Sequence, residues 1–132
     1  MSLRSQVLQV VDAGTEQLGF APSLRMEGLL DTLVSDELAA QVLASLREAL
    51  SNAARHAEAT SVEVRLAVDD VSLELEVSDD GKGITGGGRR SGLANLAARA
   101  AQVGGRFDVT SGPEGGTELL WTADLSGVDQ PD

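Results

Sequence analysis

Two successive segments of this chain alternate apolar with polar residues, and this pattern limits the possible folds more than any other feature. Residues 62–68 have an apolar side chain at every second position, and residues 73–77 repeat the pattern. A period of two is typical of a strand with one buried face. Asp69-Asp70, between the two segments, favours a tight turn, so the pattern predicts a β-hairpin. The apolar side of that hairpin needs other elements to cover it.

Three segments with helical periodicity can provide the cover. Residues 3–18 carry apolar side chains mostly three or four apart, which predicts an amphipathic helix. A longer helix is predicted from Ser35, whose hydroxyl can cap its first turn, to about Ala57. A third helix is expected over residues 92–103, with Ser91 as its cap.

Further strands are expected near 23–27, 106–110 and 117–125. Together with the helices and the hairpin they predict an α+β protein, a two-layer α/β sandwich with a mixed, mostly antiparallel sheet and helices on one face. A chain of 132 residues can bury one core but not two. We therefore expect a single domain over 1–125 and a disordered tail over 126–132.

Composition narrows the class of protein. Trp121, Phe20 and Phe107 are the only aromatic residues, so the core must be built from Leu, Val and Ala. The formal net charge of −11 repels phosphate backbones and anionic lipids, which argues against nucleic acid or a membrane surface as partner. The absence of cysteine excludes disulfides and thiolate metal sites. This composition fits a reducing compartment, so we expect a cytoplasmic location.

Two polar residues of the long predicted helix lie beside its apolar stripe. Glu48 and Asn52 are four residues apart and therefore stack on one face of the helix, at the border where it leaves the core. Such a pair can face a ligand cleft. It can equally be a solvated flank, and the helix taken alone does not decide between the two.

The second hairpin strand leads directly into a segment rich in glycine and charge. Asp79, at its end, can accept a hydrogen bond from an adenine amine, and Gly81 and Gly83 would let the backbone approach a ligand. An ordinary Asp-Gly turn is the alternative. The spacing of Gly81, Gly83 and Gly86 matches a dinucleotide-binding motif, but that motif needs a helix opening here and a parallel strand beyond it.

Basic residues are concentrated in or just after this glycine-rich segment, where a polyphosphate would need neutralising. They are Lys82, Arg89, Arg90 and Arg99. Gly92 opens a helix whose free amides suit an anion, and Gly116-Thr117 begins the last strand with a small hydroxyl.

Four segments, in this order, resemble the motifs of the GHKL family of ATPases and kinases, and the resemblance covers most of the chain. Residues 46–57 are similar to its N box, and Asp79-Asp80-Gly81-Lys82-Gly83-Ile84 is similar to its first glycine box. Residues 92–96 resemble the second glycine box, and Gly116-Thr117 resembles the final Gly-Thr element. The Arg-His-Ala ending of the N box is most similar to NarL/DesK-type histidine kinases, with the mycobacterial haem-containing dormancy sensors as expected near relatives.

The resemblance implies a Bergerat fold that binds ATP and Mg²⁺. It implies that Asp79 binds the adenine amine, that Thr117 supports this contact and that Asn52 coordinates Mg²⁺ bound to the phosphates. Glu48 matches the residue that is the general base in hydrolysing members, and positioning is an equal alternative for it in kinases. The remaining residues that it assigns to the nucleotide site are Arg55, His56, Gly81, Gly83, Ile84, Gly92, Leu93 and Asn95.

The resemblance also implies partners that this sequence does not contain. A histidine kinase phosphorylates a histidine on a dimerising helical domain and passes the phosphoryl group to a response regulator. The only histidine here is His56, inside the N box, so we expect a catalytic fragment that acts on a separate phosphoacceptor domain. The alternatives are a free-standing serine kinase of the anti-sigma-factor type and a non-catalytic nucleotide-binding module.

Overall fold

The computed structural model describes residues 2–81, 90–111 and 115–125. Four helices and a π-helix alternate with five strands along the described chain. In order they are α1 (Leu3–Leu18), β1 (Ser23–Glu27), α2 (Leu30–Leu33), α3 (Asp36–Asn52), the π-helix η1 (Ala53–Ala57), β2 (Val62–Val68), β3 (Ser72–Asp79), α4 (Arg90–Gln102), β4 (Phe107–Ser111) and β5 (Thr117–Asp124).

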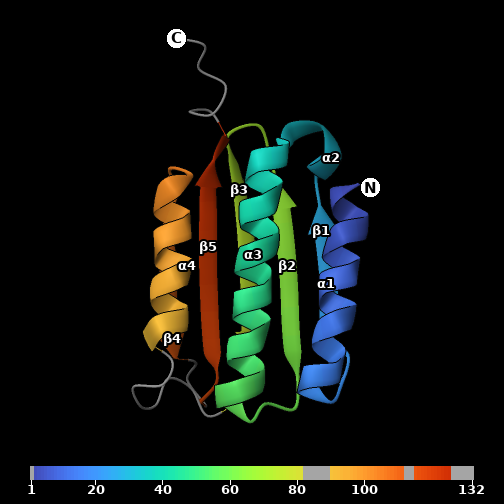
Figure 1. Ribbon diagram of the computed structural model, residues 1–132, viewed down its shortest axis with the longest axis vertical. Helices are drawn as coiled ribbons and strands as arrows, with labels where there is room; N and C mark the ends of the chain where they lie inside the picture. The colour runs from blue at the N-terminus through green and yellow to red at the C-terminus, as the bar shows by residue number, and fades with distance from the viewer. Residues whose placement is uncertain (1, 82–89, 112–114, 126–132) are drawn as a thin grey trace.

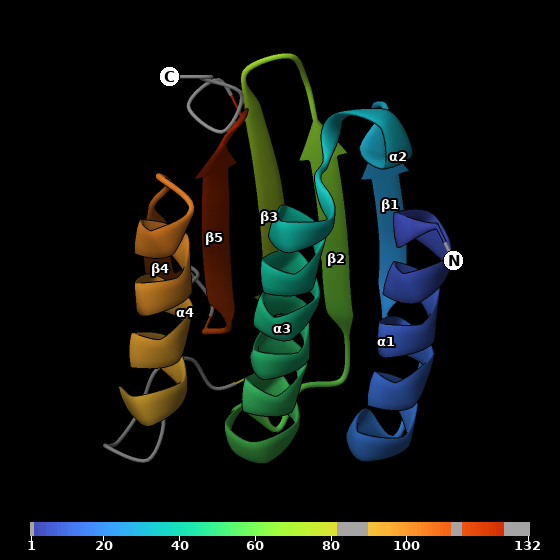
Figure 2. The ribbon, with the colours of Figure 1, turned by 45° about the horizontal axis from the view of Figure 1, so that its top comes forward.

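The five strands form one mixed sheet in the order β1-β2-β3-β5-β4. Only β1 pairs in parallel, with β2; the other three pairings are antiparallel. Helices α1, α3 and α4 lie side by side on one face of this sheet, and Figures 1 and 2 show the layers from two directions. The predicted α+β sandwich with helices on one face is therefore confirmed.

The core lies between the helices and the sheet. The alternating apolar residues of β2, β3 and β5 are buried there against the apolar stripe of α3, which includes Val42, Leu46 and Leu50. Trp121 on β5 is 1% exposed, and its indole N–H donates to the Leu96 carbonyl of α4. Because a buried indole N–H needs an acceptor, this bond fixes α4 over β5.

Most predicted elements are confirmed to within a few residues, and the structure differs from the prediction in three places. Ser91 was predicted to cap the third helix, but α4 begins at Arg90, so Ser91 lies inside its first turn. The short helix Leu30–Leu33 was missed, because four residues carry too little periodicity to detect. The last turn of the long helix is a π-helix, which ends where Glu58 adopts a left-handed conformation.

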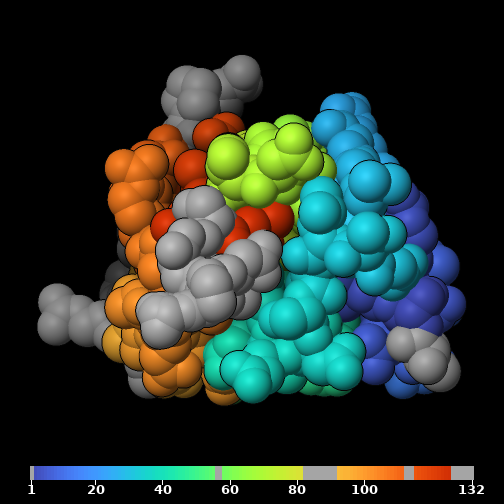
Figure 3. Space-filling model, turned by 90° about the horizontal axis from the view of Figure 1, so that it is seen from above, coloured from blue at the N-terminus to red at the C-terminus, as the bar shows by residue number. Residues whose placement is uncertain are grey.

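The elements that carry the predicted site residues meet at one end of the sandwich, the lower end in Figure 1. There α3 and β3 end and α4 and β5 begin. The opposite end, seen in Figure 3, carries the turn of the β2–β3 hairpin, next to the segment that contains α2. No helix in the described part of the chain has the length and apolar character needed to cross a membrane.

Candidate functional site

Asp79 and Thr117 form the centre of the candidate site on the sheet. They are directly opposite partners in the β3–β5 ladder, and the alternation of both strands turns their side chains toward the helix-covered face. Thr117 is 1% exposed, whereas Asp79 is half-buried at the strand end. The fold thus places the Asp79 carboxylate and the Thr117 hydroxyl on neighbouring strands at the same end of the sheet.

Close backbone contacts fix the loop around this pair. The Asp79 carboxylate accepts a hydrogen bond from the Gly81 amide at 2.9 Å. The Gly116 amide donates to the Gly81 carbonyl at 2.6 Å. A Cβ on Gly116 would lie 2.4 Å from the Asp79 carbonyl oxygen, and its φ of +80° is in the left-handed region. Residue 116 must therefore be glycine for β5 to approach the end of β3 this closely.

Glu48 and Asn52 lie in the last two turns of α3, at the same end of the sandwich as this pair. Asn52 is 1% exposed, and its Nδ2 atom has no hydrogen-bond partner among the residues that the structure describes. Leaving a buried amide unpartnered costs about 1–3 kcal/mol, so such an atom marks a place where a ligand would be stabilising. The Glu48 side chain is 22% exposed and lies 3.9 Å from Arg55, whose side chain is 64% exposed. The sequence left open whether the Glu48–Asn52 side of the helix faces solvent or a cleft. In the structure the Asn52 side chain is buried.

The first turn of α4 lies directly against the Glu48–Asn52 pair. A Cβ on Gly92 would meet Glu48 Oε2 at 2.8 Å and Asn52 Nδ2 at 3.1 Å, so glycine leaves room for both side chains. One turn further on, Asn95 Nδ2 donates to Glu48 Oε1 at 3.4 Å. The second glycine box therefore borders the N box in space, although the two are more than thirty residues apart.

Asp80 is a well-bonded residue of this region to which the sequence assigned no role. Its carboxylate accepts hydrogen bonds from the Thr60 amide at 2.7 Å, the Ser61 amide at 2.9 Å and the Thr60 hydroxyl at 2.5 Å. The Thr60 hydroxyl and the two amides lower the pKa of Asp80 to about 2, so the carboxylate is ionised at neutral pH. In the sequence it is the second carboxylate of Asp79-Asp80-Gly81, within the segment that resembles the first glycine box.

Other predicted residues lie in different surroundings. Leu93 is half-buried and packs against the core. The backbone of His56 lies in η1, while its side chain is outside the described part of the structure. Gly83 and Ile84 also lie outside the described residues, as do Lys82 and Arg89.

Arg99 was predicted to neutralise phosphate, and this prediction is wrong. Its guanidinium donates to Gln41 Oε1 at 3.0 Å, on α3. Gln41 precedes Asn52 by about three helical turns, so Arg99 binds α3 well away from the site end. Arg99 follows the glycine-rich segment in sequence, but α4 runs away from that segment, which the spacing of charges could not reveal.

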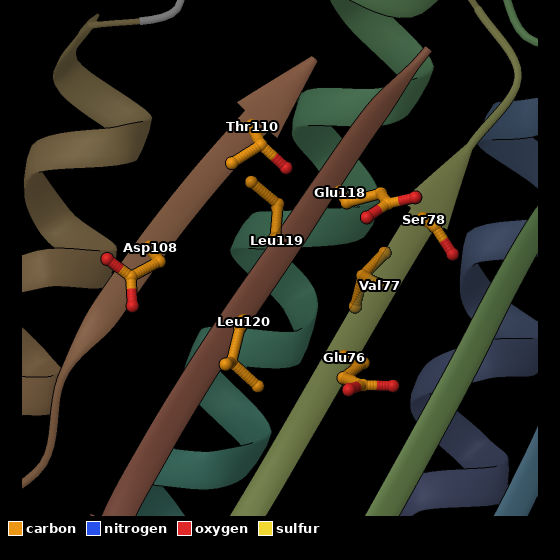
Figure 4. Close-up of a pocket in the computed structure, with 8 residues that line it drawn as sticks. All are labelled: Glu76, Val77, Ser78, Asp108, Thr110, Glu118, Leu119 and Leu120. Carbon is orange, nitrogen blue, oxygen red and sulfur yellow. The ribbon is translucent and has the colours of Figure 1, made fainter. Parts of the chain in front are cut away.

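A hollow of about 370 Å³ lies on the helix-free face of the sheet, away from this site. Figure 4 shows its lining, which comes from β3, β4 and β5. Three of the lining side chains are carboxylates, those of Glu76, Asp108 and Glu118. Because they repel a polyphosphate, this hollow does not suit a nucleotide.

The residues at the site end favour a metal held through phosphates over a metal held by protein alone. Across residues 2–81, 90–111 and 115–125, no three His, Cys, Asp or Glu side chains cluster closely enough to hold a metal ion. Asn52 offers one amide oxygen, a ligand type that Mg²⁺ accepts alongside substrate phosphates. The unpartnered atom of this buried amide is Nδ2, an N–H donor, which suits a phosphate oxygen beside such a metal.

The chain belongs to the family of histidine kinase-, DNA gyrase B- and HSP90-like ATPases, whose pattern matches residues 38–127. The sensor histidine kinase NarS of Mycobacterium tuberculosis is 31% identical over 133 residues, which cover 86% of this chain and 31% of NarS. The sensor protein VraS of Staphylococcus aureus is 36% identical over 89 residues, which cover 65% of this chain and 26% of VraS. The chain thus spans less than a third of the length of these curated relatives.

A solved structure supports the same assignment at the level of the fold. The blue-light activated histidine kinase EL346 of Erythrobacter litoralis superposes with a TM-score of 0.74 at 23% identity. The match covers 96% of this chain and 46% of that one. The predicted membership of the GHKL family is confirmed.

Replacing Gly116 by alanine tests the close approach of β5 to Asp79. We expect Gly116→Ala to lower the free energy of unfolding by more than about 3 kcal/mol, because it combines a left-handed φ with a backbone clash. Gly19→Ala is the matched control: its φ is +86°, but its Cβ would meet nothing within 4 Å, so only about 1 kcal/mol is expected. Urea denaturation measures both, and equal losses would contradict the clash.

Proposed function

We propose that this chain is the ATP-binding catalytic domain of a two-component sensor histidine kinase. It binds Mg·ATP and presents the γ-phosphate to a histidine of a separate dimerisation domain. The observation that carries the proposal is the buried, unpartnered amide of Asn52, which lies beside Glu48 and Gly92 at the end of the sandwich where Asp79 is located. Family membership and relatives that are sensor kinases support the same function.

The sheet side of the site binds the adenine. Asp79 accepts a hydrogen bond from the exocyclic amine, and Thr117, its partner across the ladder, supports that contact. The Gly81–Gly116 backbone bond keeps the strand end in place while the ring packs nearby. A carboxylate acceptor favours adenine over guanine, because guanine presents a carbonyl where adenine presents an amine.

The helix side of the site binds the phosphates. Asn52 supplies the ligand to Mg²⁺, which neutralises charge on the phosphate oxygens when it is bound. The first turn of α4, which begins at Arg90 and includes Gly92, directs its free amides at the same region. Arg55, exposed and next to Glu48, is a further cation within reach of a polyphosphate.

Transfer needs positioning more than covalent chemistry from this chain. A nitrogen of the acceptor histidine forms a bond to the γ-phosphorus while the bond from that phosphorus to the β,γ-bridging oxygen breaks, and ADP leaves with the electron pair. Glu48, one turn before Asn52 on α3, orients the acceptor imidazole or takes its proton. The acceptor domain and a response regulator are the partners we propose for the parent protein.

The finer assignments of the sequence stay predictions. They are the NarL/DesK subdivision, the kinship with haem-containing dormancy sensors, the cytoplasmic location and the extent of the domain over 1–125. The serine kinase and the non-catalytic module remain the competing functions. Phosphohistidine is acid-labile and phosphoserine is acid-stable, which separates the two kinases, whereas a non-catalytic module transfers no phosphate.

Asp79→Asn tests the adenine contact. We expect it to weaken binding of Mg·ADP about 10- to 100-fold, because the amide replaces a charge-assisted acceptor and can turn a donor toward the adenine amine. Asp108→Asn, the same change on the helix-free face, should leave the affinity unchanged. Isothermal titration calorimetry gives both dissociation constants. Wild-type affinity in Asp79→Asn would remove Asp79 from the site.

Asn52→Ala tests the metal side. We expect Mg²⁺ to strengthen ADP binding in the unsubstituted chain and to lose most of that effect, about tenfold or more, in the variant. Affinity for adenosine should stay largely intact, because the metal contacts only phosphates. Ser45→Ala is the control, since Ser45 is also buried on α3 with an unpartnered hydroxyl among the described residues. Equal losses for adenosine and Mg·ADP would contradict this role.

Phosphoryl transfer tests the function as a whole. Incubated alone with γ-labelled ATP, the chain should gain almost no acid-labile phosphate, because its only histidine, His56, lies in the N box. Added to the histidine-bearing dimerisation domain of its parent protein, it should label that domain. Stoichiometric self-labelling that disappears in His56→Ala would overturn the proposal, and acid-stable label on a serine substrate would favour the competing kinase.

A further inference from the structure

The hydrogen bonds of Asp80 join two segments that are both needed by the site. Thr60 and Ser61 donate three bonds to its carboxylate, and the Asp80 amide donates back to the Ser61 carbonyl at 3.3 Å. The two segments are 19–20 residues apart in sequence. Asp80 follows the last residue of β3 and is exposed, and both of its carboxylate oxygens accept bonds from Thr60-Ser61. Its carboxylate therefore holds the scaffold of the site together.

Each of the joined segments leads directly to a ligand-binding residue. Thr60-Ser61 connects η1 to β2, so it fixes the exit of the helix that carries Asn52 and Arg55. Asp80 follows Asp79 at the end of β3. The chain leaves η1 through Glu58 in a left-handed conformation, with no strand pairing until Val62. The carboxylate of Asp80 thus connects the helix side of the site to its adenine side.

The opposite side of the Asp79 loop is already fixed by β5. Gly81 accepts a bond from Gly116 and donates one to the Asp79 carboxylate. Asp80, between Asp79 and Gly81, fixes the other side of the loop through its hydrogen bonds to Thr60-Ser61. The lowered pKa of Asp80 agrees with three donors converging on one ionised carboxylate.

We propose that Asp80 is a positioning residue for nucleotide binding: by holding Thr60-Ser61 against the end of β3, it sets the place of Asp79 relative to the helix that carries Asn52. The proposal rests on the function proposed above. A binding group must be held to within about 0.5 Å of its working position, and its supporting residues carry out that task. Asp80 itself makes no contact with the ligand.

The chain contains a matched control for the test. Asp69 is also an exposed carboxylate that accepts backbone N–H bonds, from Val71 at 2.8 Å and Ser72 at 2.9 Å, and these bonds lower its pKa too. It lies in the turn of the β2–β3 hairpin, at the end of the sandwich shown in Figure 3 and opposite the site. Asp69→Ala therefore removes a comparable structural carboxylate from the far end of the same two strands.

The experiment compares Mg·ADP binding by calorimetry in Asp80→Ala and Asp69→Ala, with their melting temperatures alongside. We expect Asp80→Ala to weaken binding about tenfold, the scale typical of lost support for a ligand-binding group. Asp69→Ala should stay within about twofold of the unsubstituted chain at a similar melting temperature. In the transfer reaction, Asp80→Ala should raise the KM for ATP by a larger factor than it lowers kcat at saturating ATP, since Asp80 lies next to the adenine contact of Asp79.

Milder variants keep the test decisive if Asp80→Ala does not fold. Thr60→Val removes the hydroxyl donor and keeps both backbone donors, so it should weaken Mg·ADP binding by about threefold. Thr60→Ser retains the hydroxyl and should restore the affinity. Unchanged affinity in both Asp80→Ala and Thr60→Val, or equal losses in Asp80→Ala and Asp69→Ala, would overturn the positioning role alone. Failure of the unsubstituted chain to bind Mg·ADP would overturn the proposed function itself.

Discussion

The pairing of β3 with β5 is the constraint on which the rest of the structure depends. Its register places Asp79 opposite Thr117 and Leu75 opposite Trp121, so a single ladder sets both the candidate site and the centre of the core. The indole of Trp121 then fixes α4 through Leu96. Because α4 begins at the same end as β5, its first turn is brought against Glu48 and Asn52. A shift of one residue in the β3–β5 register would turn Thr117 and Trp121 to the other face of the sheet.

The site is built from the ends of strands and helices. The backbones of Gly81 and Gly116 are in direct contact beside it. The strands bury alternate residues along their length, and the last inward position of β3 is a carboxylate where an apolar residue would otherwise lie. On α3, the buried stripe likewise ends in Asn52. Polar groups are tolerated there because the end of the sandwich is where a ligand can satisfy them. Glycine at 92 leaves room for the α3 side chains beside α4, and glycine at 116 lets β5 approach the end of β3.

Strong local patterns made most of the fold and the site predictable. The alternation over 62–68 gave a strand with those bounds, and the periodicity over 3–18 gave α1. Each of the four motifs was ambiguous alone. Their order along the chain indicated the GHKL family and a single nucleotide site. The start of α4, the π-helix and the direction of Arg99 were not predictable, because each is decided by packing against a distant segment.

The sequence by itself determined which faces are buried and which residue types reach the site, since periodicity and motif spacing are properties of neighbours along the chain. Only the tertiary structure decided how those residues meet. In the tertiary structure the Asn52 amide is buried and Gly92 lies against Glu48. Arg99 donates to Gln41, and Asp80 accepts a bond from Thr60. These contacts join segments from 20 to 58 residues apart. Their geometry depends on strand register and helix docking, which no local pattern encodes.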